Sequence, residues 1–311
     1  MTLQEAVQIY AICARAENRS ERTVEWVTGA AKRLAAFGGS ENLDITTIDT
    51  DLIRQFILSL DEQPAFTNHP FNRPLTRPVS PETKSCYVRG LKALFSRLFA
   101  EGYSSYNPMS RIKTPKVPIR EPEILSEAEI TRLFSVMDKS TAKGFRDYTL
   151  SLTLLDTGMR VSELCQLTLD DVDLGNGYFR LMGKGQKQRF VPMGFKLTKI
   201  LLKYASSYRY CDTGSHYFFI TREGHPLNRN RIAKILRGYT HKAGITGKKV
   251  HPHVFRATKA VFYLRHGGDP FTLQKCLGHS TLTMTRRYSA IADSDVKASH
   301  LKYGVVDKLN I

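Results

Sequence analysis

Six side chains in the second half of the sequence are of types that act together on a phosphodiester. They are two arginines, two histidines, one lysine and one tyrosine, in the order Arg160, Lys184, His253, Arg256, His279 and Tyr288. Each one taken alone is more often structural, since arginines beyond helix ends and lysines at hairpin tips are common. Their combination and their order along the chain carry the prediction.

The chemistry explains each residue type. A phosphodiester attacked by an oxygen nucleophile gathers charge on its non-bridging oxygens, which a pair of arginines and a histidine N–H can stabilise. The departing sugar oxygen needs a proton, which a lysine on a flexible tip can supply. The pKa of tyrosine in water is about 10, so we expect neighbouring cations to lower it and a histidine to accept the proton.

No comparable set of carboxylates or thiols is present in the sequence. Asp170, Asp171 and Asp173 fall at the edge of a predicted sheet, where they are explained as turn and strand-start residues. Five dispersed cysteines without a CxxC pair predict reduced thiols, and neither a disulfide framework nor a zinc site. We therefore expect no metal and no other cofactor, and a metal-dependent nuclease is disfavoured.

The charge of the chain indicates its partner. Among 311 residues, 46 Lys and Arg stand against 29 Asp and Glu, a formal net charge of +17. Residues 1–110 hold 12 basic and 12 acidic side chains, so the whole excess lies in the remainder. A strongly basic half of the chain predicts an extended anionic binding partner, and we expect this partner to be double-stranded DNA. The alternative is a basic protein kept soluble by self-repulsion.

The same composition argues against a membrane. The sequence has no run of 18 apolar residues, no secretory signal and no basic amphipathic helix with exposed Trp or Phe. The expected location is therefore cytoplasmic, on the nucleoid when the protein is bound to DNA.

Apolar spacing and capping residues predict four helices in a first domain, 1–107. They cover 2–17, 20–37, 48–60 and the stretch from Ser80-Pro81 to about residue 101. Four prolines mark 61–80 as a long irregular loop. The fourth helix has an apolar face and a basic face. We interpret the basic face as a candidate DNA contact, with a solvated face as the alternative, and it carries Arg89, Lys92 and Arg97.

A linker and a second domain follow. Residues 108–122 are rich in proline and basic side chains, which predicts an extended linker with Lys113 and Lys116 as candidate DNA contacts. In the second domain, 123–311, a small antiparallel sheet is predicted over 171–192. Helices are predicted at 126–138, 144–156, 195–208, 228–243, 253–266 and 270–277. The fold class is therefore mainly α with a small antiparallel β-sheet.

Four strings carry a resemblance to a known family. They are TGMRVSELCQL (157–167), GKGQKQRFVP (183–192), HVFRATKA (253–260) and LGHSTLTMTRRYSAI (277–291). In order and spacing they resemble the tyrosine recombinase, or phage-integrase, family over the whole second domain. The helical region 1–107 resembles the SAM-like core-binding domain of that family. The expected catalytic domain is thus the mixed α/β domain 123–311, with its tail at 293–311.

The resemblance implies roles for particular residues. Tyr288 would be the nucleophile, Glu163 would brace the site, and the other five residues of the set would activate the phosphate. Lys187 does not match the place of the catalytic lysine and is interpreted as a phosphate contact. The family usually has a histidine, a small hydroxyl residue and an aromatic where this chain has Ala257-Thr258-Lys259. We therefore expect altered packing behind the site and a Lys259 that is exposed or faces DNA.

The resemblance also implies a reaction and an assembly. The enzyme would cut and rejoin DNA at specific sites through a 3′-phosphotyrosine bond, as a homotetramer on two sites, with or without an accessory directionality protein. The tail would dock on a neighbouring subunit or fold back on its own domain. The long segment 61–80 favours integration or excision of a mobile element. The alternatives are Xer-type chromosome or plasmid dimer resolution, a type IB topoisomerase and a non-catalytic DNA-binding protein.

Overall fold

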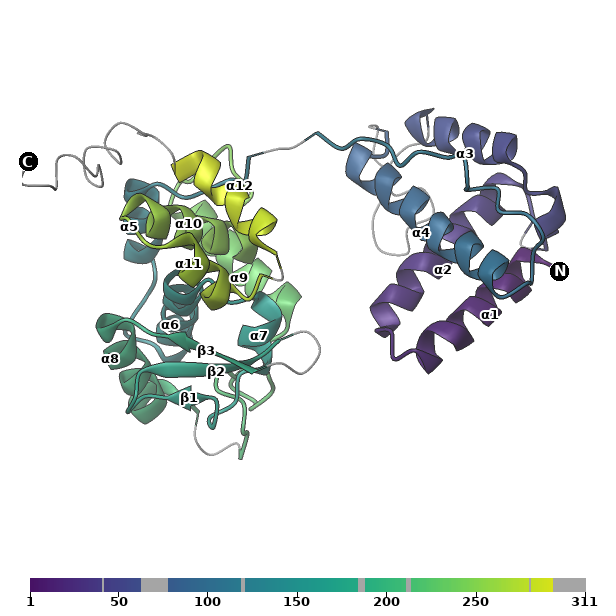
Figure 1. Ribbon diagram of the computed structural model, residues 1–311. Helices are drawn as coiled ribbons and strands as arrows, with labels where there is room; N and C mark the ends of the chain where they lie inside the picture. Colours follow the sequence, from purple (N-terminus) through teal and green to yellow (C-terminus); the bar gives the residue numbers. More distant parts are fainter. Residues whose placement is uncertain are drawn as a thin grey trace, which may run out of the picture. The chain divides into compact units, whose positions relative to one another are not determined.

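The computed structural model describes residues 1–40, 42–62, 78–118, 121–183, 188–210, 214–279 and 281–292, with side chains of the last helix described as far as Tyr288. The chain forms two compact units, 1–120 and 121–311 (Figure 1), each with a hydrophobic core of its own. No helix within the described ranges has the length and apolar content needed to cross a membrane. Lys184, Lys187 and the tail 293–311 lie outside the described residues.

The first unit is a helical bundle. Its elements are α1 (Leu3–Ala16), α2 (Glu21–Phe37), the 3-10 turn η1 (Ile45–Thr47), α3 (Thr50–Glu62) and α4 (Pro81–Ala100). The helices begin where the sequence places capping residues: Ser80, for example, accepts a hydrogen bond from the backbone of Thr83, and Pro81 occupies the first turn. Helices α2 and α4 approach closely at Gly90, where an added Cβ would lie 2.8 Å from the Cβ of Ala30.

The core of the first unit also includes residues that follow its last helix. Met109 and Ile112, at the start of the predicted linker, are 2% and 6% exposed and pack in the core of this unit. Apolar side chains at these two positions hold the segment on the helices. Lys113 and Lys116, which follow them, are exposed.

The basic face predicted on α4 is partly engaged within the first unit. Arg97 forms ion pairs with Glu17, which follows α1, and with Glu101. The guanidinium of Arg89 lies 5.9 Å from the centre of the Trp26 ring on α2. Lys92 is half-buried. Two of the three predicted DNA contacts on this helix therefore have partners inside the protein.

The second unit is mixed, and most of its elements are helices. In chain order, the helices and strands of this unit are α5 (Glu127–Ser135), α6 (Ala142–Thr157), α7 (Val161–Gln166), β1 (Val172–Asp173), β2 (Tyr178–Met182), β3 (Gln188–Pro192), α8 (Phe195–Lys203), the π-helical turn η2 (Tyr204–Tyr208), α9 (Arg229–Lys242), α10 (Pro252–Arg265), α11 (Pro270–Leu277) and α12 (Leu282–Ala292). The prediction of a mainly helical fold with a small antiparallel sheet is confirmed.

The sheet is antiparallel in the order β1-β2-β3, with Phe179 opposite Val191 and Leu181 opposite Arg189. Along β2 the side chains alternate between buried and exposed, so one face of the sheet packs on the core. Asp173 accepts a hydrogen bond from the backbone of Asn176 in the turn between β1 and β2, the turn role expected from the sequence.

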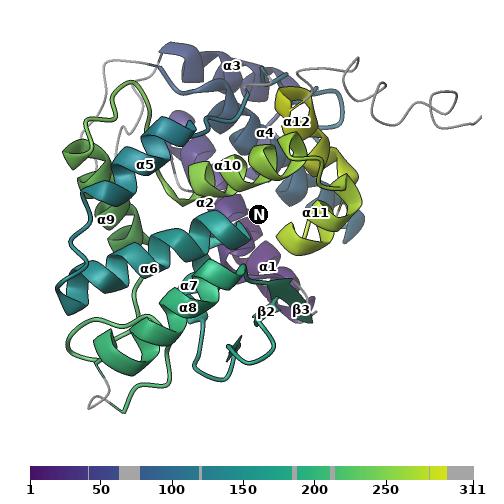
Figure 2. The ribbon, with the colours of Figure 1, turned by 90° about the vertical axis from the view of Figure 1, so that its left-hand side faces the viewer.

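Helix α10 lies among α6, α9, α11 and α12 (Figure 2). Its first turn carries His253 and Arg256, and α6 ends at Gly158, just before Arg160. Thr258 fixes the start of the second unit to α10, because its hydroxyl accepts a hydrogen bond from the backbone of Leu125 at 2.9 Å. These elements bring Arg160, His253 and Arg256 to one side of the second unit.

Candidate active site

One pocket of about 330 Å³ contains five of the six predicted site residues. Arg160, His253, Arg256, His279 and Tyr288 all line it. The sixth, Lys184, is not among the described residues. The wall also includes Arg229 and Arg287, which the sequence had not singled out. The folding of the second unit therefore gathers residues that are up to 128 positions apart in the sequence.

Arg160 is held by the turn that joins α6 to α7. Gly158 ends α6 in the left-handed conformation, with φ +63°, where a side chain would be strained. Arg160 then caps α7, and the Glu163 carboxylate accepts from its backbone N–H at 2.7 Å and from its Nη1 at 3.0 Å. Its Nη2 donates to the carbonyl of Gly278 at 2.9 Å. Backbone and guanidinium are thus fixed together.

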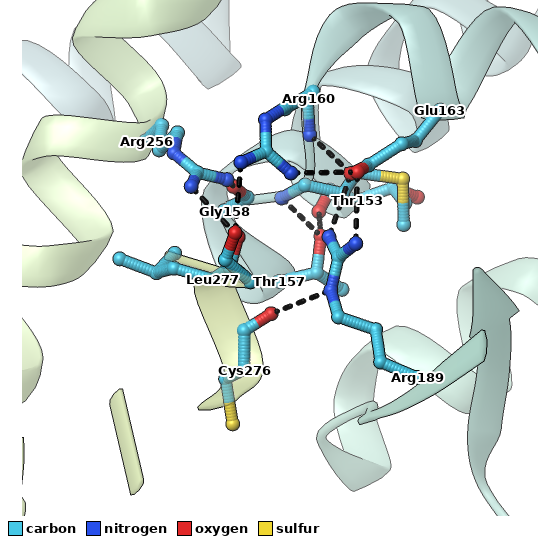
Figure 3. Close-up of polar contacts among 11 residues, drawn as sticks. Thr153, Thr157, Gly158, Arg160, Glu163, Arg189, Arg256, Cys276 and Leu277 are labelled. Atoms are coloured by element: carbon cyan, nitrogen blue, oxygen red, sulfur yellow. Dashed lines mark hydrogen bonds and ion pairs between the residues drawn. The ribbon is translucent and has the colours of Figure 1, made fainter. Parts of the chain in front are cut away.

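Arg256 is more deeply buried, with 4% of its surface exposed. Its Nη1 donates to the carbonyl of Gly158 and its Nη2 to the carbonyl of Leu277, each at 2.7 Å (Figure 3). Burial, and then the charge of Arg160, lower the pKa of Arg256 to about 10. The guanidinium still carries its charge at neutral pH.

A third arginine, Arg189 on β3, joins this cluster. Its two terminal nitrogens donate to the two carboxylate oxygens of Glu163 at 2.8 and 2.7 Å, and its Nε donates to the carbonyl of Cys276 at 3.2 Å (Figure 3). Burial alone would raise the pKa of Glu163, but the hydrogen bonds and charge of Arg189, together with Arg160, lower it. Glu163 is therefore an ionised carboxylate between two guanidinium groups, consistent with the predicted bracing position.

The two histidines of the pocket differ in their surroundings. His279 is 7% exposed, and its Nδ1 lies 3.0 Å from Oγ1 of Thr285 on α12. Burial, followed by the charges of Arg256 and Arg160, lowers the pKa of His279 to about 4, so its ring is neutral at pH 7. Desolvation and Arg256 also lower the pKa of His253. Neutral imidazoles can accept a proton or donate one N–H.

Tyr288 lies on α12 with its side chain turned into the pocket. It is 5% exposed, and its ring is nearly parallel to that of His279, with centroids 6.1 Å apart. Burial raises the pKa of the phenol, and the charge of Arg256 offsets this only in part. The expectation that cations would bring this pKa below its ordinary value is therefore wrong for the protein without DNA, because desolvation outweighs the charges.

The residues after Arg256 lie behind the pocket. Ala257 and Thr258 are buried, which fits small side chains packed against neighbouring elements. Lys259 is half-buried, and its amine lies 5.3 Å from the centre of the Tyr263 ring. Lys259 does not line the pocket of the other site residues. Within the described part of the chain, no three His, Cys, Asp or Glu side chains are grouped as a metal site requires.

Comparison with known proteins identifies the family. Residues 123–295 match the phage integrase family. Tyrosine recombinase XerD of Listeria monocytogenes is 33% identical over 222 residues, which is 70% of this chain and 74% of that protein. Tyrosine recombinase XerC of Bacillus subtilis is 34% identical over 230 residues, which is 72% of this chain and 75% of that protein.

A solved structure extends the similarity to the fold of nearly the whole chain. The XerH site-specific recombinase, in its post-cleavage complex with a palindromic difH substrate, superposes with a TM-score of 0.70 at 21% identity, covering 97% of this chain and 85% of XerH.

The chain belongs to the phage integrase family. It is a tyrosine recombinase, an enzyme that exchanges DNA strands. The family resemblance seen in the four sequence strings is confirmed.

Proposed function

We propose that this enzyme cuts and rejoins DNA at a specific site through a covalent bond between Tyr288 and a 3′ phosphate. The observation that carries the proposal is the placement of Arg256, which is anchored to the carbonyls of Gly158 and Leu277 and lines the same pocket as Tyr288. A phosphate that enters the pocket would meet the nucleophile and a fixed cation together.

The proposed reaction uses the side chains of the pocket together with Lys184, whose role rests on the sequence. The Tyr288 oxygen attacks phosphorus, and the bond from phosphorus to the 5′ oxygen breaks. A guanidinium has five N–H donors, and the contacts of Arg160 and Arg256 described above leave donors for the two non-bridging oxygens. His279 supplies a further N–H, and His253 accepts the phenol proton. Lys184 protonates the departing 5′ oxygen, as expected from the sequence.

The covalent intermediate retains the energy of the broken bond. Its phosphotyrosine ester can be attacked by the 5′ hydroxyl of another strand, which releases Tyr288 and seals the DNA without ATP. The proposed partner is a double-stranded recombination site, with a homotetramer bridging two sites. Exposed Lys113 and Lys116 are the strongest candidates for contacts to the DNA backbone outside the pocket.

Covalent capture tests this proposal. The probe is a pool of DNA duplexes with a randomised central segment; the protein is added, the mixture is denatured, and duplexes that remain attached are recovered and sequenced. We expect one attached sequence class and a protein–DNA band on denaturing gels that Tyr288→Phe abolishes. Tyr178→Phe, which removes the hydroxyl of an exposed tyrosine on β2, is the matched control and should leave the band unchanged. DNA binding without any band would contradict the proposal.

For the biological role we propose integration or excision of a mobile element, supported by the length of the proline-rich segment 61–80. Chromosome or plasmid dimer resolution is the second candidate, supported by the XerC and XerD relatives. The captured sequence distinguishes the two. A match to the ends of an element that flanks the coding region supports the first role, and a match to a single chromosomal or plasmid site supports the second.

A further inference from the structure

We propose that Arg189 is a positioning residue for the cleavage reaction, and that it acts on Arg160 through Glu163. The proposal rests on the proposed function, because it assigns Arg189 to the same site. Arg189 does not line the pocket, and it contacts the Glu163 carboxylate, which in turn binds Arg160.

The strand geometry explains how an arginine reaches this position. Arg189 pairs with Leu181 across the sheet, and Leu181 and Val191 on the same face are buried. The side chain therefore points inward, and only 13% of it is exposed. A charged group at an inward strand position needs a partner, and the partner is the Glu163 carboxylate, which is 8% exposed.

The carboxylate of Glu163 accepts hydrogen bonds from two arginines, which approach it from two sides. Arg160 donates to it with its backbone N–H and one guanidinium nitrogen, and Arg189 donates to both oxygens with its fork. A carboxylate has about four lone-pair sites, so these donors occupy all of them. Because Arg189 holds the far side, Arg160 donates only one guanidinium nitrogen to the carboxylate. Apart from the Nη2 hydrogen bond to the Gly278 carbonyl, its other donors remain available toward the pocket.

Arg189 also supports the second anchor of Arg160. That anchor is the carbonyl of Gly278, which has φ +65° at the end of α11. An added Cβ at Gly278 would lie 3.0 Å from Cζ and Nε of Arg189, so the guanidinium packs directly against this turn. The hydrogen bond from Arg189 to the Cys276 carbonyl fixes the same helix end. The Arg160 guanidinium has two acceptors, the Glu163 carboxylate and the Gly278 carbonyl, and Arg189 contacts the residues that carry both of them.

This arrangement predicts what loss of Arg189 does. Without the fork, the carboxylate can turn and accept two guanidinium nitrogens of Arg160, which withdraws Arg160 from the phosphate. Misplacement of a catalytic group by about 1 Å can cost about a hundredfold in rate. We therefore expect Arg189→Gln to slow formation of the Tyr288–DNA bond by about that factor, with duplex affinity unchanged. Arg189→Lys should recover only part of the rate, because an ammonium cannot fork onto two oxygens.

The test measures the single-turnover rate of covalent bond formation, and separately the binding affinity, on one duplex taken from the captured pool. Arg180→Gln is the matched control, since Arg180 lies on the adjacent strand, faces outward and pairs with Asp171. We expect this control to react at the wild-type rate. Glu163→Gln and the double variant with Arg189→Gln complete a cycle, in which Arg189→Gln should slow the reaction by a smaller factor without Glu163 than with it. Additive losses would overturn the proposal.

A modified substrate separates a role at the non-bridging oxygens from a role in protonation of the leaving group. In a duplex with sulfur in place of the 5′ bridging oxygen, the leaving group departs without needing a proton. Because Arg189 acts through Arg160, which stabilises charge on the non-bridging oxygens, we expect the variant to remain slow on this substrate. Full recovery would overturn the proposal, since it would place Arg189 in leaving-group protonation.

The two proposals fail in different ways. If wild-type protein forms no covalent band, the proposed function fails whatever Arg189 does. If wild type reacts and Arg189→Gln reacts equally fast, only the positioning role fails. Should Arg189→Gln not fold, Arg189→Lys carries the same test: it must slow the reaction when Glu163 is present and slow it by a smaller factor in the Glu163→Gln background.

Discussion

Replacement of Glu163 by glutamine should destabilise the second unit strongly. The substitution removes the one carboxylate between Arg160 and Arg189 and turns an amide N–H toward guanidinium donors. Removal of one partner of a buried ion pair costs about 3 to 5 kcal/mol of the free energy of unfolding. Because the Arg160 side chain is 39% exposed and water can solvate part of it, we expect the lower end, about 3 kcal/mol.

Calorimetry provides the assay. For a unit of this size, each kcal/mol shifts the melting temperature by about 2 to 4 °C, so the second unit should melt about 6 to 12 °C earlier. The first unit serves as an internal reference. Glu17→Gln is the matched control, because Glu17 also bridges two arginines, Arg19 and Arg97, but at an exposed position; we expect a much smaller shift.

The pH dependence gives an independent check. The pKa of Glu163 in the folded protein lies below its ordinary value of 4.5, so its contribution to stability is present above that pH and is lost as the pH falls through the folded-state pKa. The difference in melting temperature between wild type and Glu163→Gln should therefore shrink in acid. A variant that melts with wild type at pH 7, or a difference that grows in acid, would refute the reasoning.

Three further changes have defined outcomes. The pKa of His279 falls from 6.5 to about 4 on folding, so the unfolded chain binds more protons than the folded protein between these pH values. Urea titrations should therefore show the free energy of unfolding declining as the pH drops through that range, and His279→Asn should make this decline less steep. Thr285→Val should slow cleavage about tenfold, because it removes the hydroxyl that sets the His279 tautomer, and Thr285→Ser should restore the rate; equal rates for both variants would contradict this. Gly158→Ala should lower the melting temperature more than Gly102→Ala, since both have positive φ but only Gly158 lacks room for a Cβ.

The helices and the sheet were predictable because their signals are local. Ser80 with Pro81, and Ser126 with Glu129, mark helix starts that the structure confirms. Helices α12 and α7 were not predicted. The 6 residues of α7 are too few for a periodic pattern. Its only signal is Arg160 with Glu163 three residues later, the spacing of a capping box.

Contacts between distant segments were beyond such reasoning. Arg189 finds its partners 26 and 87 positions away, so spacing alone could not pair them. The same limit applies to Arg97. The helical periodicity places Arg97 on a basic helix face, but it does not show that its ion-pair partner is Glu17, 80 positions away. The upward shift of the Tyr288 pKa depends on burial by packed helices, which composition does not show.

The end of α11 has a mechanical consequence. Three successive carbonyls, at Cys276, Leu277 and Gly278, each hold a different arginine, and the negative end of the helix dipole favours that arrangement. The next residue is His279, and α11 also packs against α12, which carries the nucleophile. A shift of this single helix end therefore redirects all three arginines at once. Reactivity should respond to the position of α11 in an all-or-none manner, with no stepwise loss of one donor after another.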